Sequence, residues 1–155
     1  PKPKLYYHSK DQFIGDHIAP YALQCGLPDG LYDNVPPADI YLDDINELVF
    51  GNIKLKCLHT PGHAPGHVVF YIEKQPFQIE GETLPLHNDA PILIAGDTLF
   101  RGSIGRTDLP GGDHQQLIQA IRKQLFTLPE NTLVFPGHGP CTTIAREKNN
   151  NPFFR

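Results

Sequence analysis

The sequence predicts a single α/β domain, of the layered α+β kind, spanning residues 1–155. Residues 53–57 alternate apolar and polar side chains, as a strand with one buried face does. Residues 91–95 are all apolar, which is typical of a strand covered on both faces. Residues 113–125 place apolar side chains at helical spacing. A chain of 155 residues is long enough to bury one hydrophobic core, so one domain is expected.

The first 44 residues predict short elements separated by a long loop. Residues 5–8 are rich in aromatic side chains, which is consistent with a short strand. Residues 11–25 predict one helix or two, with an interruption at Pro20 because proline disrupts helix interiors. Residues 26–44 hold several proline, glycine and aspartate residues, and these predict the loop.

Two more strands are expected in the rest of the chain. Residues 67–72 and 132–135 are short runs rich in apolar and β-branched side chains. The polar residues between Glu73 and Ala90 predict an excursion between paired strands. The terminal residues 151–154 are expected to be extended, because a proline restricts the residue before it.

The helix over residues 113–125 has clear start signals. Asp113 suits the N-cap position, and Gln116 stands three positions later, which is the arrangement of a capping box. The apolar stripe that would face the core consists of Leu117, Ile118, Ile121 and Leu125. This segment is therefore predicted to begin at Asp113 and to pack against the sheet.

Composition and charge argue against several classes of partner. The net charge is −4 and the basic residues are scattered, so no nucleic-acid partner is expected. No apolar run approaches the roughly 18 residues of a membrane span, and no secretory signal is recognisable, so no membrane partner is expected. Cys25, Cys57 and Cys141 have no CxxC spacing, which predicts reduced thiols and a cytoplasmic protein.

Three segments share one design, in which an apolar strand leads to a turn containing glycine and then to a residue that can bind a metal. They are residues 58–63, 93–97 and 134–138, which end in His63, Asp97 and His138. Glycine allows a sharp turn and a close approach of the backbone, and the preceding strand fixes where the turn begins. The sequence therefore predicts that three ligand-type side chains are presented from rigid strand ends.

Two imidazoles and a carboxylate suit zinc, manganese or ferrous iron. A carboxylate has two oxygens with which to bridge a pair of metals, so Asp97 is the expected bridge and the expected catalytic residue. A single histidine or aspartate after a glycine is more often a turn or capping residue. The recurrence of the pattern at three strand ends is what favours a metal site.

His67 is expected to be structural, or to orient a metal ligand from the second shell of residues. It follows His63 by four residues, which would be a zinc-binding spacing on a helix. Pro65 and Gly66 lie between the two histidines and disfavour a helix. Metal sites need outer partners that orient their ligands, and His67 is placed to serve as one.

Two interpretations of Arg106 stay open. It lies in the loop 102–108, which follows Asp97 closely and is expected to hang over the same pocket. The planar guanidinium could bind a substrate carboxylate through paired hydrogen bonds. Alternatively, Arg106 forms a salt bridge with Asp108 and only holds the loop.

These motifs resemble those of the metallo-β-lactamase superfamily. The segments that carry the resemblance are His59-Thr60-Pro61-Gly62-His63-Ala64-Pro65-Gly66-His67, Gly96-Asp97-Thr98-Leu99-Phe100 and Pro136-Gly137-His138-Gly139-Pro140. The loop 105–108 and residues 151–153 agree as well. Within the superfamily, the chain is most similar to the small bacterial glyoxalase II-like (hydroxyacylglutathione hydrolase-like) hydrolases.

The resemblance implies an αββα sandwich of two similar halves, of which this chain holds mainly the C-terminal half and part of the N-terminal half. It implies that His63, Asp97 and His138 are metal ligands and that Asp97 bridges two divalent metals, with zinc expected and iron or manganese as alternatives. It also implies a Thr-His-x-His-x-Asp-His motif before the segment that matches residues 5–8, and this sequence has none. Since the chain also starts at Pro1 and has no methionine, a single domain truncated at its N-terminus is predicted.

The reaction implied by the resemblance is hydrolysis of a thioester, such as an S-acylglutathione. Water or hydroxide held between two metals would attack the carbonyl, because metal binding lowers the pKa of water toward about 7. Asp97 would help to position the nucleophile, and Arg106 would help to place an anionic substrate. A small-molecule substrate is therefore the expected partner, and a homo-oligomer is left open.

Two alternative functions stay open at this point. Persulfide dioxygenases share the fold and the loop 105–108 but use a single iron, whereas Gly139-Pro140 after His138 fits the hydrolases better. The other alternative is a non-catalytic fragment that only binds partners or packs in an assembly. Because most of the family's ligands are missing, residues 1–155 alone are expected to show little or no activity.

Overall fold

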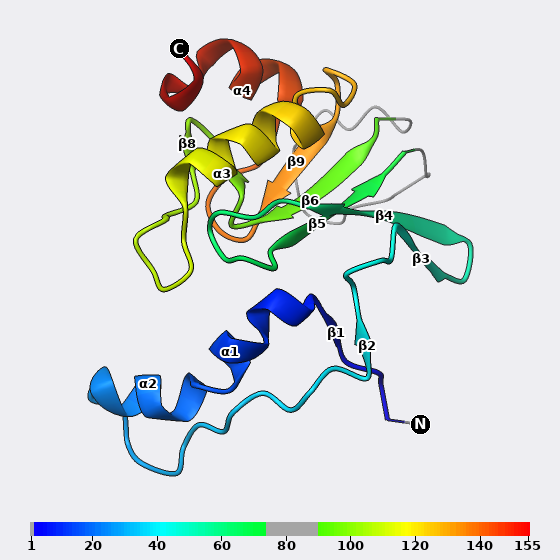
Figure 1. Cartoon of the computed structure of the whole chain (residues 1–155). Coiled ribbons are helices and arrows are strands. Elements are labelled where there is room, and N and C mark those ends of the chain that lie inside the picture. The colour runs from blue at the N-terminus through cyan, green and yellow to red at the C-terminus, as the bar shows by residue number, and fades with distance from the viewer. Residues whose placement is uncertain (1, 74–89) are drawn as a thin grey trace. The chain divides into compact units, whose positions relative to one another are not determined.

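The computed structural model describes residues 2–73 and 90–155, which form two compact units, Pro1–Ile45 and Asn46–Arg155 (Figure 1). Residues 74–89, where nearly all of the expected polar excursion falls, lie outside the described residues. None of the helices within the described ranges is long and apolar enough to cross a membrane. The three cysteines form no disulfide with one another.

The unit Pro1–Ile45 contains a small parallel sheet and short helices. β1 (Tyr6–Tyr7) pairs with β2 (Ile40–Tyr41) in parallel. The helical elements between them are η1 (Ser9–Asp11), α1 (Gln12–Gly15) and α2 (Ile18–Gln24). The predicted strand at residues 5–8 is therefore confirmed at β1, and β2 adds a strand at the end of the predicted loop.

The expected interruption at Pro20 is wrong. The break between α1 and α2 falls at Asp16 and His17, and Pro20 is the third residue of α2. Amides in the first turn of a helix have no partner within that helix, so the missing N–H of proline costs nothing there. Proline near the start of a helix is thus compatible with the helix continuing.

The unit Asn46–Arg155 is built on one six-stranded mixed sheet. The strands are β3 (Glu47–Phe50), β4 (Ile53–His59), β5 (Val68–Ile72), β6 (Ile92–Gly96), β9 (Leu133–Pro136) and β10 (Thr142–Thr143). Their order is β10-β9-β6-β5-β4-β3, and all neighbours are antiparallel except β6 and β9. The four predicted strands are confirmed as β4, β5, β6 and β9. A separate hairpin, β7 (Leu99–Phe100) and β8 (Ser103–Ile104), follows β6.

One face of this sheet packs against the helices (Figure 1). Leu93 of β6 is paired with Tyr71 of β5 and with Val134 of β9, so the three side chains form a row on one face. The helical elements that cover the row are α3 (His114–Ala120), its π-helical continuation η2 (Ile121–Leu125), and α4 (Ile144–Asn150). Their buried side chains in this core are Leu117, Ile121, Leu125 and Ile144. The predicted apolar stripe therefore faces the core as expected.

The expectation that β6 is covered on both faces is confirmed for part of the strand only. Leu93 and Ala95 are fully buried against the helices. On the opposite face Ile92 is 7% exposed, whereas Ile94 is 45% exposed in the described part of the chain. Alternate residues of a strand point to opposite faces, so an entirely apolar run does not by itself show that both faces are covered.

α3 begins where it was predicted to begin. Asp113 Oδ1 accepts a hydrogen bond from the Gln116 amide at 2.9 Å. The Asp113 amide, which a complete capping box would pair with the Gln116 side chain, donates instead to the Gly62 carbonyl at 2.8 Å. The start of α3 is therefore tied to the turn that carries His63.

The expectation of an extended tail is wrong. Pro152–Phe154 form a 3-10 helix, η3, because Asn151 Oδ1 accepts a hydrogen bond from the Phe153 amide. Proline suits the first position of such a helix, where its fixed φ is already correct. α4, which comes directly before, was not predicted from the sequence.

Candidate metal centre

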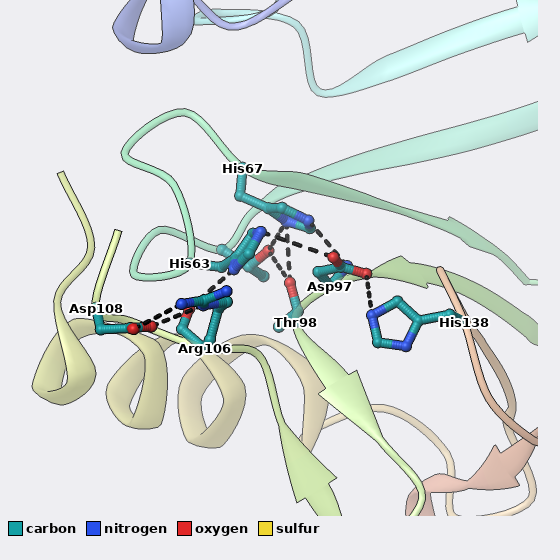
Figure 2. Close-up of polar contacts among 8 residues, drawn as sticks. His63, His67, Asp97, Thr98, Arg106, Asp108 and His138 are labelled. Atoms are coloured by element: carbon teal, nitrogen blue, oxygen red, sulfur yellow. Dashed lines mark hydrogen bonds and ion pairs between the residues drawn. The ribbon is translucent and has the colours of Figure 1, made fainter. Parts of the chain in front are cut away.

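The three glycine turns lie at one edge of the sheet and bring the predicted ligands together (Figure 2). His63 follows β4, Asp97 follows β6 and His138 follows β9. β6 and β9 are parallel, and β4 runs in the same direction as β6 because β5 is antiparallel to both. Strands that run in one direction end at the same edge of a sheet, which is why three segments distant in sequence converge.

The Asp97 carboxylate lies between the two histidines. Asp97 Oδ2 is 3.7 Å from His63 Nε2, and Asp97 Oδ1 is 3.6 Å from His138 Nε2. Both separations exceed the roughly 3 Å of a hydrogen bond. A metal with bonds of about 2.1 Å at a tetrahedral angle holds two ligand atoms about 3.4 Å apart. Each pair of atoms is therefore spaced nearly as one shared metal ion requires.

The arrangement is two histidine–aspartate pairs that share a carboxylate, with a different oxygen for each imidazole. Within residues 2–73 and 90–155, no group of three or more His, Cys, Asp or Glu side chains converges as the ligands of a single ion would. One carboxylate oxygen facing each imidazole could serve two metals, whereas two histidines and one carboxylate can also hold a single iron. The donor atoms fit divalent zinc, iron or manganese.

The Arg106 carbonyl orients the His63 ring. His63 Nδ1 lies 2.8 Å from this carbonyl oxygen. A carbonyl can only accept a hydrogen bond, so Nδ1 carries the proton and donates it. His63 Nε2 is then left with its lone pair toward Asp97, which is the tautomer that a metal needs.

His138 is positioned by a ring contact and by a close turn. Its imidazole stacks on the Phe100 ring, with centroids 4.5 Å apart and planes inclined by 28°. The Gly137 amide donates to the Gly96 carbonyl at 2.7 Å. A Cβ atom at Gly137 would lie 2.4 Å from Asp97 Oδ1, so a side chain at this position would displace the carboxylate.

His67 is hydrogen-bonded to the backbone of Asp97. His67 Nε2 accepts a hydrogen bond from the Asp97 amide at 3.2 Å. Its Nδ1 is 3.0 Å from the Thr98 hydroxyl and 3.2 Å from the Thr60 hydroxyl, and both threonines are fully buried. Because both ring nitrogens of His67 have protein partners, its geometry is that of a residue that orients a ligand (Figure 2).

Burial of the ring lowers the pKa of His67 from 6.5 to about 4, and the neighbouring His63 adds to the shift. Nε2 accepts from the Asp97 amide, so in the neutral ring Nδ1 carries the proton and can donate to a threonine hydroxyl. The hydrogen-bond pattern and the lowered pKa therefore agree on a neutral imidazole.

We expect the metal-free protein to lose stability as the pH falls from 6.5 toward 4. His67 binds a proton near 6.5 in the unfolded chain but only near 4 in the folded chain, so the unfolded state takes up more protons in this window. The free energy of unfolding should fall by about 2 kcal/mol, after allowance for partial solvent screening. Urea unfolding in chelator measures this. His67→Gln, whose amide oxygen can still accept from Asp97, should flatten this part of the profile, and an unchanged slope would contradict the assignment.

Arg106 is paired with Asp108. Its Nε donates to Asp108 Oδ1 at 2.8 Å and its Nη2 donates to Oδ2 at 2.7 Å. The hydrogen bonds from Arg106 lower the pKa of the Asp108 carboxyl to about 2. Of the two interpretations left open, the salt bridge with Asp108 is a contact that the structure shows, and substrate binding stays a prediction.

Sequence reasoning missed several residues that surround the ligands. Phe100, Thr60 and Thr98 lie within the segments that carry the resemblance, but nothing in their spacing indicated the contacts they make. The Arg106 carbonyl carries no sequence signal, because every residue has a carbonyl. These contacts arise only when the turns after β4, β6 and β9 meet.

A family model of the Metallo-beta-lactamase superfamily matches residues 84–138. The chain is 41% identical over 128 residues to the "Probable metallo-hydrolase YqgX" of Bacillus subtilis, covering 83% of this chain and 54% of that protein. It is 34% identical over 146 residues to the "Hydroxyacylglutathione hydrolase GloC" of Haemophilus influenzae, covering 94% and 61%. It is also similar to the solved structure of TTHA1623 in a di-iron-bound form, with a TM-score of 0.69, 35% identity, and coverage of 96% and 63%.

The chain thus spans 54–63% of the length of these three relatives. The matched range of the family model includes Asp97 and His138, at two of the three glycine turns. The mixed sheet with helices packed on one face confirms the predicted α/β fold class. In both sequence and fold, this chain is similar to proteins of the metallo-beta-lactamase superfamily.

Proposed function

We propose that the protein is a metal-dependent hydrolase of a thioester, such as an S-acylglutathione. The observation that carries the proposal is the placement of Asp97, whose two oxygens each face a different imidazole at metal-ligand spacing. A relative that binds two irons supports a centre with two metals, of which zinc is our first candidate. A relative named hydroxyacylglutathione hydrolase supports the substrate class.

Each residue of the site has a part in this proposal. His63 and His138 bind through Nε2, and Asp97 binds through both oxygens. Divalent metals held there would polarise the substrate carbonyl and lower the pKa of water toward about 7. His67 keeps the Asp97 backbone in place without touching the substrate. Arg106 exchanges Asp108 for an anionic group of a small-molecule substrate.

The centre needs more ligands than these residues supply. Zinc in proteins takes about four ligands, and here each pair offers one imidazole and one carboxylate oxygen. We propose that the remaining ligands lie outside these 155 residues, since the relatives are longer than this chain.

The test is hydrolysis of a glutathione thioester by the whole gene product, followed through release of the free thiol. Turnover should stop when a chelator removes the metal, and should return when zinc, iron or manganese is added back. The matched control substrate is an S-alkyl glutathione, which lacks the carbonyl and should not react. Turnover that survives chelation would contradict the proposal, and so would one iron per chain with consumption of oxygen, which would indicate the oxygenase instead.

A further inference from the structure

Glu147 of α4 is a buried carboxylate outside the candidate metal centre. Its side chain is 1% exposed and accepts hydrogen bonds from the Gly102 amide at 2.8 Å, the Asn151 side chain at 2.9 Å and the Thr142 hydroxyl at 2.5 Å. The Arg146 guanidinium lies 3.8 Å away and is half exposed. Burying a carboxylate is costly unless its oxygens are hydrogen-bonded, as they are here. Removing one hydrogen-bond donor would therefore leave an oxygen of the buried Glu147 carboxylate without a partner and destabilise the folded state.

Glu147 and Asn151 together hold the β7–β8 hairpin. The Gly102 amide, in the turn of the hairpin, donates to Glu147 Oε2. Asn151 Nδ2 donates both to Glu147 Oε2 and to the Ser103 carbonyl, the latter at 2.9 Å. Two consecutive residues of the hairpin are therefore fixed to the C-terminal segment of the chain, next to which β8 lies in Figure 1.

The segment that contains this hairpin contacts all three proposed ligands. It begins at Asp97, and Phe100 of β7 stacks on the His138 ring. After β8, the Arg106 carbonyl accepts the proton of His63 Nδ1. A movement at the turn of the hairpin would therefore reach the ligands on both sides of Asp97.

We propose that Glu147, with Asn151, is a positioning residue for the metal centre. It fixes the β7–β8 hairpin, and the hairpin keeps His63 and His138 in the orientation that a metal requires. Glu147 touches neither ligand and acts only through the hairpin. The inference rests on the proposed function in one respect, that these two histidines are taken as ligands.

The first test reads the tautomer of His63 and needs neither metal nor substrate. Histidine-labelled protein is studied by ¹H–¹⁵N correlation through the imidazole ring, in mildly alkaline buffer with chelator, where imidazoles are neutral. In the wild-type chain His63 should be the Nδ1–H tautomer, because Nδ1 donates to the Arg106 carbonyl. In Glu147→Ala the hairpin is released, and His63 should become a mixture of both tautomers.

Glu147→Gln is the conservative variant that should restore the wild-type tautomer. Its amide oxygen can still accept from Gly102 and Asn151, and its NH₂ can donate to the Thr142 hydroxyl, which is able to accept. Glu130→Gln is the matched control, since Glu130 is an exposed carboxylate paired with Lys148 at 3.6 Å. It should leave the His63 tautomer unchanged.

If Glu147→Ala does not fold, Asn151→Ser tests the same proposal. The serine hydroxyl can still accept from the Phe153 amide and so cap η3, but it no longer donates to Ser103. This variant should shift the His63 tautomer in the same direction as Glu147→Ala. A merely structural role would lower stability without moving the tautomer.

The second test is the zinc affinity of the whole gene product, measured by competition with a chromogenic chelator. Glu147→Ala should bind zinc roughly 10- to 100-fold more weakly than the wild-type chain, as other residues that orient ligands do, and Glu147→Gln should bind close to wild type. A folded Glu147→Ala or Asn151→Ser with the wild-type tautomer and wild-type affinity would overturn the inference. If the whole gene product binds no zinc, iron or manganese, the proposed function fails, and the tautomers still decide the role of Glu147.

Discussion

Asp97→Asn is expected to abolish metal binding and turnover together. Asparagine has nearly the shape of aspartate but lacks the negative charge, and its nitrogen cannot bind a metal beside an imidazole. Since a different Asp97 oxygen faces each histidine, asparagine removes the oxygen ligand from one pair and leaves only a neutral, weaker one at the other. The loss of zinc affinity should exceed the roughly 10- to 100-fold that substitutions around the ligands cause. Metal content and thiol release from a glutathione thioester measure the two effects.

The matched control for this substitution is Glu130→Gln. Glu130 is an exposed carboxylate paired with Lys148 rather than with a histidine. The zinc affinity of this variant should stay near wild type. Asp97→Asn should unfold at nearly the wild-type urea concentration, because the carboxylate is one-third exposed and asparagine has nearly its shape. Zinc binding by Asp97→Asn at wild-type affinity would contradict the assigned role.

Gly62→Ala is expected to destabilise the protein by about 3–5 kcal/mol. Gly62 has φ of +132°, where only glycine is unstrained. An alanine Cβ there would lie 2.4 Å from the Leu117 amide nitrogen and 2.6 Å from its Cα, so α3 would have to move away from the turn. This movement would also displace His63, the next residue, and zinc affinity should fall with stability.

Gly51→Ala separates the two causes of that loss. Gly51 has φ of +59°, but no atom lies within 4 Å of the position its Cβ would take. Its substitution should cost about 1–2 kcal/mol through backbone strain alone. Urea unfolding of both variants gives a difference that combines the contact between the turn and α3 with the greater backbone strain at φ of +132°. Equal losses in the two variants would show that this contact does not matter.

The sequence predicted the strand ends and the ligand types because these depend on local pattern. The alternation at residues 53–57 and the apolar stripe from Leu117 to Leu125 were each visible without any knowledge of the fold. The turn glycines marked where His63, Asp97 and His138 would follow their strands. Their convergence follows from the common direction of β4, β6 and β9, and that direction is a property of the whole sheet.

What the sequence did not predict depends on contacts between distant residues. α4 is short and mostly polar, so no local pattern indicated that Glu147 is buried and hydrogen-bonded to Gly102 and Thr142. The stacking of Phe100 on His138 joins residues from two different strand ends. The exposure of Ile94 could not be predicted for a related reason, because the type of a residue does not reveal which parts of the fold cover its side chain.

The central claim is that Asp97 bridges two metal ions, one beside His63 and one beside His138. Anomalous diffraction at the zinc edge from crystals of the zinc-loaded protein tests it most directly. Two peaks are predicted, one between Asp97 Oδ2 and His63 Nε2 and the other between Asp97 Oδ1 and His138 Nε2. A single peak shared by both histidines, or no peak beside Asp97, would contradict it.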